Sequence, residues 1–181
     1  LSSEITLQPI KRFDLDAAII FSDILMLPYG LNQKVDFKKN FGPVLGNLDI
    51  GKMSKIDEID FVEKIYPVYK AIKSVSSEMN SKNKNTIGFV GAPWTLLVYM
   101  INQQSPKKDI KKDFFADDFL INRILLIIEK FLKVHIKNQI DSGANIIQIF
   151  DSWAGLLEER DYPNYIYTPT LNLVDYVKSL N

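Results

Sequence analysis

Residues 16–26 read DAAIIFSDILM, a short apolar run that stops on Ser22 and Asp23. A run without polar alternation is typical of a strand buried on both faces, as in a parallel sheet covered by helices. The polar pair then lies at the carboxyl-terminal tip of the strand, the edge at which open parallel sheets and (β/α)8 barrels bind ligands. Asp23 is therefore a candidate functional residue, although a strand-end aspartate also commonly caps a helix or shapes a turn.

The same pattern recurs twice further along the chain. A strand is expected over residues 86–90, before the turn GAPW, and another over residues 145–150, before DSWAG. Strands that alternate with helices predict βαβ units and a parallel sheet with helices outside, which is an α/β fold, here in one domain over residues 1–181. The expected helices cover residues 3–13, a segment that begins near residue 67, residues 95–101 and residues 118–140.

A long segment separates the first strand from the helix near residue 67. Residues 27–54 hold several prolines and glycines and predict an irregular excursion. Long loops inside compact domains usually have a function. Because this excursion leaves the tip of the first strand, we expect it to cover a substrate.

The composition excludes several classes of function. Lysine plus arginine and aspartate plus glutamate both number 22, so no net charge attracts nucleic acid or an anionic membrane. Cysteine is absent, which excludes disulfides and thiolate metal sites in these residues. No apolar run approaches the ~20 residues of a membrane span, and no signal peptide is evident. No glycine-rich phosphate loop follows any strand. We expect a cytoplasmic protein.

Three stretches stand out in order along the chain: EITLQPIKRFDLDAAIIFSDILM at residues 4–26, GFVGAPWTLLVYM at residues 88–100 and IIQIFDSWAG at residues 146–155. Together they resemble the matching segments of the uroporphyrinogen decarboxylase family. The resemblance implies a (β/α)8 TIM barrel that removes carbon dioxide from the four acetate side chains of uroporphyrinogen, giving coproporphyrinogen for haem and chlorophyll biosynthesis. It also implies a homodimer that uses no metal and no organic cofactor.

The resemblance implies roles for individual residues. Asp23 is similar to the family's central aspartate, which accepts hydrogen bonds from the pyrrole N–H groups and stabilises positive charge on the ring. Tyr99 matches a tyrosine whose hydroxyl reaches a substrate carboxylate or that aspartate, and Ser152 matches a serine that binds the substrate. Phe21 is expected to line the pocket, and Phe89 to lie inside the barrel.

Other conspicuous residues are expected to have structural roles. His135 is the only histidine, in mid-helix among apolar neighbours and without a second histidine or cysteine to share a metal. Asp151 is expected to shape a turn, while Trp94 and Trp153 are expected to pack. The lysines of residues 107–112 are interleaved with aspartate and predict a solvated surface rather than an anion site.

The resemblance also indicates a fragment. The family's arginine-bearing motif, which meets the substrate's carboxylates, would precede Leu1, and an active-site histidine would follow Asn181. The chain is thus expected to form a partial barrel, about half of an enzyme of ~250 residues or more, and to be inactive alone.

Two alternative functions stay open. The first is a corrinoid-linked methyltransferase of the same superfamily, which holds zinc with histidine and cysteine. An upstream arginine motif, as against downstream histidine and cysteine ligands, would discriminate the two. The second is an inactive fragment that serves as a tetrapyrrole-binding or interaction module. The presence of Asp23, Tyr99 and Ser152 disfavours the second.

Overall fold

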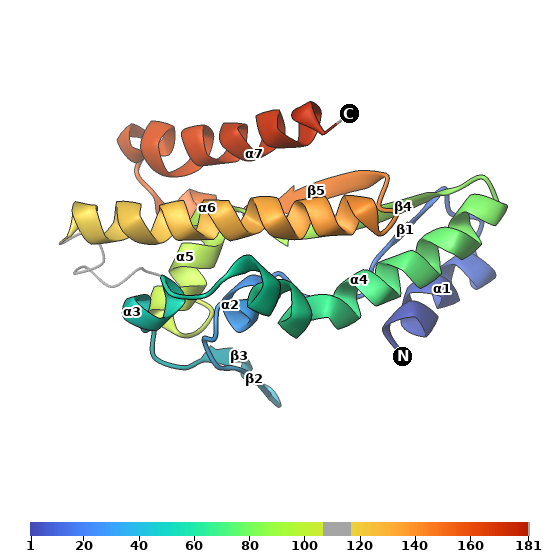
Figure 1. Ribbon diagram of the computed structural model, residues 1–181, viewed down its shortest axis with the longest axis horizontal. Helices are drawn as coiled ribbons and strands as arrows, with labels where there is room; N and C mark the ends of the chain where they lie inside the picture. Colours follow the sequence, from blue (N-terminus) through green and yellow to red (C-terminus); the bar gives the residue numbers. More distant parts are fainter. Residues whose placement is uncertain (107–116, 181) are drawn as a thin grey trace.

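The computed structural model describes residues 1–106 and 117–180. Three parallel strands form one sheet in the order β1-β4-β5, and β2 and β3 form a separate antiparallel pair (Figure 1). The strands are β1 (Ala17–Ile19), β2 (Val35–Lys38), β3 (Gly42–Leu45), β4 (Asn85–Gly91) and β5 (Ile146–Phe150). The α-helices are α1 (Ser2–Arg12), α2 (Met26–Gly30), α3 (Ile50–Met53), α4 (Glu58–Ser81), α5 (Pro93–Asn102), α6 (Asp118–Asp141) and α7 (Thr168–Ser179).

Parallel pairing of β4 with both neighbours organises the sheet. Ile87 of β4 lies opposite Ile19 of β1 and Ile146 of β5. Each parallel connection needs a crossover, and the long helices α4 and α6 lie in the two crossovers and contact each other. This arrangement is part of a (β/α)8 barrel and confirms the fold predicted from the sequence.

Helices cover one face of the sheet. Leu7 and Ile10 of α1 pack with Ala18 and Ile20, together with the buried stripe of α4. In β1 and the two residues after it, burial therefore alternates, because Ala18 and Ile20 are each 2% exposed whereas Phe21 is 57% exposed. The prediction of a first strand buried on both faces is wrong, since no helix in the described part of the chain covers the second face. We call this second face the open face; its residues are Ile19, Phe21, Ile87, Phe89, Ile146, Gln148 and Phe150.

Helix α4 begins earlier than predicted. It starts at Glu58, where Asp57 accepts a hydrogen bond from the Asp60 N–H at 2.7 Å, and Pro67 lies inside it. A proline removes one backbone hydrogen bond from a helix, and here the N-cap and a long apolar stripe offset that loss. The buried stripe contains Phe61, Ile65, Ile72, Val75 and Met79.

Residues 27–54 are more regular than predicted. They contain most of α2, the β2–β3 hairpin and α3. Asn40 and Gly42 have φ angles of 63° and 90°, and the Phe41 N–H donates to the Lys38 carbonyl at 3.0 Å. These two left-handed residues close the hairpin. The prolines and glycines of the segment predict irregular structure and not a hairpin.

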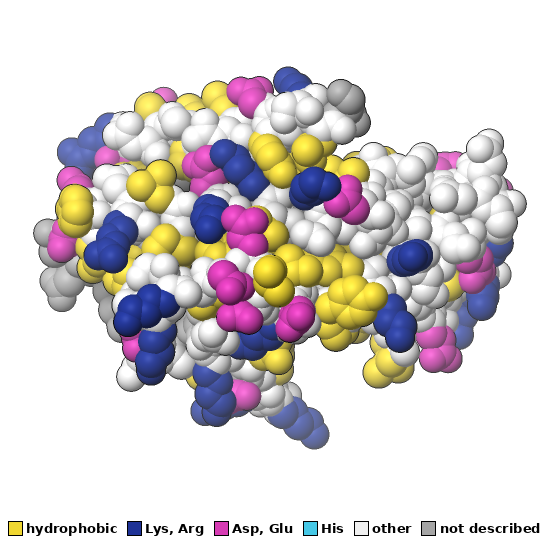
Figure 2. Space-filling model, viewed as in Figure 1, with side chains coloured by type: hydrophobic (Ala, Val, Ile, Leu, Met, Phe, Trp, Pro, Cys, Tyr) yellow, Lys and Arg dark blue, Asp and Glu magenta, His cyan; other side chains and the backbone are white. Residues whose placement is uncertain are grey.

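The surface carries charges of both signs. Figure 2 shows lysine, arginine, aspartate and glutamate side chains interspersed over the face that bears α4 and α6, with hydrophobic side chains exposed between them. This mixed pattern agrees with the balanced composition. The predicted lysine-rich surface at residues 107–112 lies outside the described residues. Among the helices that are described, none has both the length and the apolar character needed to cross a membrane.

The single histidine lies in the helical core. His135 is 4% exposed, and its Nδ1 lies 3.0 Å from the Tyr69 hydroxyl, which joins α6 to α4. Burial lowers the pKa of His135 to about 4. The described residues contain no group of three or more side chains able to hold a metal. His135 is thus a buried neutral side chain in the helical core.

We predict a loss of stability in mild acid because of His135. Its folded-state pKa of about 4 lies below the ordinary value of 6.5, so the unfolded chain takes up a proton first as the pH falls. The free energy of unfolding should therefore fall between about pH 6.5 and pH 4, by about 3 kcal/mol from this group. Chemical denaturation of wild type and His135→Met at several pH values checks this. Equal pH dependence of the two proteins in this range would contradict it.

Candidate active site

Helix α1 fixes the backbone just before Asp23. The last bond from this strand to β4 joins the Ile20 N–H to the Ile87 carbonyl at 3.0 Å. The Phe21 N–H then donates to Thr6 Oγ1 at 2.8 Å, and Ser2 Oγ donates to the Phe21 carbonyl at 2.5 Å. Two hydroxyl groups of α1 thus bind the backbone N–H and carbonyl of Phe21. Ser22 and Asp23 therefore leave the sheet at a defined point.

Asp23 shapes a turn and also remains available to a ligand. Its Oδ1 accepts a hydrogen bond from the Leu25 N–H at 2.7 Å. Among the described residues, no cation and no other side chain binds the Asp23 carboxylate. Burial raises the pKa of Asp23, and the Leu25 hydrogen bond opposes this with a smaller effect. The structural and functional interpretations of this aspartate are therefore compatible.

A cavity of about 550 Å³ opens beside Asp23. Phe21 and Asp23 line it from the strand tip, Val68 from α4 and Phe37 from the β2–β3 hairpin. The lining is mainly apolar, which accounts for the raised pKa of the carboxyl group. Sequence reasoning missed Phe37, because nothing in the local pattern tells which way a hairpin folds back.

Tyr99 and Ser152 belong to the segments that follow the next two strands. Tyr99 belongs to α5, directly after β4, and its ring contacts the Trp153 ring at a centroid distance of 6.0 Å. Ser152 is exposed and lies in the turn that follows β5. Neither residue lines the Asp23 cavity, and no hydrogen bond between described residues joins either one to Asp23. The contact with Trp153 brings Tyr99 close to the residue that follows Ser152, while the Asp23 cavity is lined by other residues.

A hydrogen-bond network holds the residues on both sides of Ser152. Thr95 Oγ1 donates to Asp151 Oδ1 at 2.7 Å and accepts from the Trp153 N–H at 3.1 Å. The Trp94 ring N–H donates to the Trp153 carbonyl at 2.9 Å. Asp151 therefore does more than shape a turn, since it ties the tip of β5 to α5. Burial raises its pKa, and the hydrogen bond from Thr95 partly opposes this.

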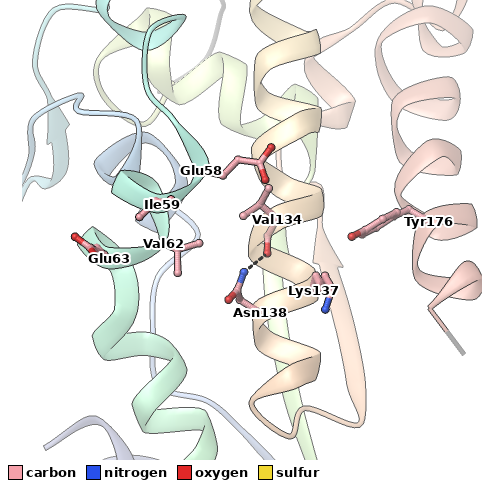
Figure 3. A pocket seen from close by; sticks show the side chains of 8 residues that line it. All are labelled: Glu58, Ile59, Val62, Glu63, Val134, Lys137, Asn138 and Tyr176. Atoms are coloured by element: carbon pink, nitrogen blue, oxygen red, sulfur yellow. Dashed lines mark hydrogen bonds between the residues drawn. The ribbon is translucent and has the colours of Figure 1, made fainter.

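A second hollow lies on the helical side of the molecule. It has a volume of about 360 Å³ and lies among α4, α6 and α7 (Figure 3). Glu58, Glu63, Lys137 and Tyr176 are among its lining residues. None of the predicted site residues reaches it, so we place the candidate active site at the strand tips.

We predict that Thr95→Val destabilises the fold. Thr95 is fully buried, and its loss leaves the Asp151 carboxylate and the Trp153 N–H without their partner. Loss of such bonds should lower the free energy of unfolding by about 1–3 kcal/mol. Thr86→Val is the matched control, because the Thr86 hydroxyl is equally buried and has no partner; its free energy of unfolding should stay equal or rise. Urea denaturation measures both, and equal losses in the two variants would refute the prediction.

The chain is similar to bacterial decarboxylases. It is 42% identical over 180 residues to a uroporphyrinogen decarboxylase of Rickettsia bellii, which covers 98% of this chain and 52% of that protein. It is 39% identical over 179 residues to the enzyme of Rickettsia felis, covering 98% and 51%. The chain thus spans about half the length of the curated relatives it matches.

A solved structure and a sequence family agree with this similarity. A methyltransferase from Methanosarcina mazei superposes with a TM-score of 0.80 at 14% identity, over 97% of this chain and 53% of that one. At this identity the likeness concerns the fold alone. The sequence model of the family described as uroporphyrinogen decarboxylase (URO-D) matches residues 1–181. With a match over its whole length and relatives at about 40% identity, the chain belongs to the uroporphyrinogen decarboxylase family.

Proposed function

We propose that the protein containing this chain removes carbon dioxide from the four acetate side chains of uroporphyrinogen and yields coproporphyrinogen. The observation that carries the proposal is Asp23, a carboxylate that has no cationic partner among residues 1–106 and 117–180 and that lines an apolar cavity after a parallel strand. Identity of 42% to a relative named uroporphyrinogen decarboxylase supports the same activity. We further propose that the protein works in the cytoplasm as a homodimer.

The proposed chemistry needs a fixed anion. When the bond between the acetate methylene and its carboxylate breaks, carbon dioxide leaves and an electron pair stays behind. Prior protonation of the pyrrole ring lets the ring accept that pair. A second proton then reaches the methylene carbon, and the ring releases the proton that it first took up, so the net change replaces carbon dioxide by one proton. A carboxylate held close to the ring nitrogens stabilises the positive charge of the protonated ring. Asp23 fits this task because an ionised carboxylate accepts several charge-assisted hydrogen bonds at once.

The other candidate residues would bind and orient the substrate. In this proposal the Tyr99 hydroxyl and Ser152 hydroxyl bind substrate carboxylates from the tips that follow β4 and β5. Phe21 would pack against a pyrrole ring from the wall of the Asp23 cavity, where it is 57% exposed. The hydrogen bond from Thr95 to Asp151 holds the residue that precedes Ser152. The proposed mechanism involves no metal and no organic cofactor.

One alternative has an observation in its favour. The solved methyltransferase shares the fold of this chain with a TM-score of 0.80. Its identity of 14% carries nothing about the reaction, whereas the two decarboxylases are 42% and 39% identical. We therefore favour decarboxylation over methyl transfer.

Product chromatography tests the proposed reaction. We expect the whole protein, given reduced uroporphyrinogen in the dark and without oxygen, to form products with seven, six, five and four carboxylates in turn. A reaction after exhaustive chelation of metals should proceed at the same rate. A folded whole protein that forms none of these products would overturn the proposal and favour the methyltransferase or binding-module alternative.

We predict that Asp23→Ala loses most turnover while the fold survives. Removal of one preorganised electrostatic group costs about 10²–10³-fold in rate. Loss of the hydrogen bond from the Leu25 N–H should lower the free energy of unfolding by only about 1 kcal/mol. The matched control is Asp16→Ala, which removes an exposed carboxylate just before the other end of the same strand. Its turnover should equal that of wild type. A near-normal rate for Asp23→Ala, with folding checked by circular dichroism, would exclude the assigned role.

A further inference from the structure

The ladder between β1 and β4 stops before the strand tips. In a parallel ladder, every second residue of a strand bonds to the same neighbour. After the bond from the Ile20 N–H to Ile87, the register predicts bonds from the Phe89 N–H to Ile20 and from the Ser22 N–H to Phe89. Neither bond forms, because the backbone N–H and carbonyl of Phe89 both bond to another group.

That group is the side-chain amide of Gln139 on α6. Gln139 Oε1 accepts from the Phe89 N–H at 3.0 Å, and Gln139 Nε2 donates to the Phe89 carbonyl at 3.0 Å. One side chain thus makes both hydrogen bonds that β1 would otherwise make with Phe89 of β4. Gln139 is fully buried, so the amide has no water to exchange with and both bonds lie in an environment of low dielectric constant.

The surroundings are shaped to admit this amide. Gly88 precedes Phe89, and a methyl group at Gly88 would collide with Gln139 Oε1. Ala144 and Ile147 would stand 3.2 Å from the same methyl group. A side chain at position 88 would therefore push the amide away, so the glycine and the glutamine act together. The backbone of Phe89 is held from the helical side of the sheet.

Phe89 occupies the middle of the open face. Its ring makes an edge contact with Phe150 of β5 at a centroid distance of 5.4 Å. If the register of β1 continued, Phe21 would lie opposite Phe89. Gln139 therefore acts on the strand between Phe21 and Phe150, two residues before the tip at Gly91. With its ladder partner displaced, the chain of β1 leaves the sheet and turns at Asp23.

We infer that Gln139 is a positioning residue: it takes the place of β1 beside Phe89 and so sets where the chain of β1 leaves the sheet, which places Asp23 relative to the helix that carries Tyr99. The inference rests on the proposed function, because this placement matters only if one substrate meets both Asp23 and Tyr99. Gln139 itself touches no substrate. A change of its amide should alter turnover through geometry, even where the protein stays folded.

The substitution Gln139→Glu turns this contact into a titratable one. A neutral glutamic acid has the same shape and can make both bonds, since its carbonyl accepts and its hydroxyl donates. The ionised form cannot donate to the Phe89 carbonyl and repels it. Burial raises the pKa of a carboxyl group, to about 8–9 in documented cases, so the two forms exchange in a range where turnover can be measured.

The matched control is the neighbouring amide. Asn138 Nδ2 donates to the Val134 carbonyl of its own helix and faces the hollow between α4 and α6, away from the sheet (Figure 3). Asn138→Asp makes the same change of amide to acid on the same helix without reaching Phe89. Gln139→Met supplies a side chain of similar length that makes neither hydrogen bond at any pH.

The experiment measures kcat and KM for uroporphyrinogen in the whole protein between about pH 6 and pH 9. Each variant is divided by wild type at the same pH, at a temperature where circular dichroism shows every protein folded. We expect the kcat/KM ratio of Gln139→Glu to start near that of wild type and to fall about tenfold as the new acid ionises. Gln139→Met should be low throughout, and Asn138→Asp should stay level with wild type.

The outcomes separate the two proposals. Suppose that wild type turns over but the kcat/KM ratio of Gln139→Glu does not change with pH, or that Gln139→Met has wild-type rates. Either result overturns the positioning role and leaves the decarboxylase proposal standing. A purely structural role would lower the melting temperature of the variants but leave the kcat/KM ratio of the folded protein unchanged with pH. Absence of products from wild type itself overturns the decarboxylase proposal, and the positioning role with it.

Discussion

Parallel pairing of β4 with both β1 and β5 is the constraint on which the rest of the structure depends. Parallel neighbours need long crossovers, and the 24-residue helices α4 and α6 occupy them. The same pairing brings the carboxyl ends of three strands to one edge of the sheet. Asp23 and Ser152 follow two of those ends within a few residues, and Tyr99 lies in the helix α5 that follows the third, so the sheet topology directs all three segments to the same edge.

Buried polar side chains then join the elements in pairs. Tyr69 and His135 join α4 to α6, Thr95 and Asp151 join α5 to the tip of β5, and Gln139 joins α6 to the backbone of Phe89. An unpaired polar group in the interior is costly, so each pair disfavours any arrangement that separates its members. Apolar packing holds the helices on the sheet, and these bonds select the register in which they pack.

The order of the elements follows from local patterns. Glycine and proline mark the turns after β4, and the helical spacing of Ile72, Val75 and Met79 predicts the buried stripe of α4. The errors arose where a local signal competed with a distant one. Pro67 indicates a helix start, yet the cap at Asp57 and the packing of the stripe extend the helix back through it. The apolar run of β1 indicates burial on two faces, but helices of the described chain cover only one.

The candidate site divides in the same way. The sequence by itself determined that Asp23 follows the first strand, that Tyr99 and Ser152 follow two others, and that the single histidine lies within a helix among apolar neighbours. Only the tertiary structure decided that Phe37 lines the cavity beside Asp23 and that Asp151 accepts a hydrogen bond from Thr95. It also decided that the Gln139 side chain binds the Phe89 backbone in place of β1. A sequence pattern reports on residues a few positions apart, because dihedral angles and helical or strand periodicity act over that range. Contacts between residues fifty positions apart depend on how whole elements pack.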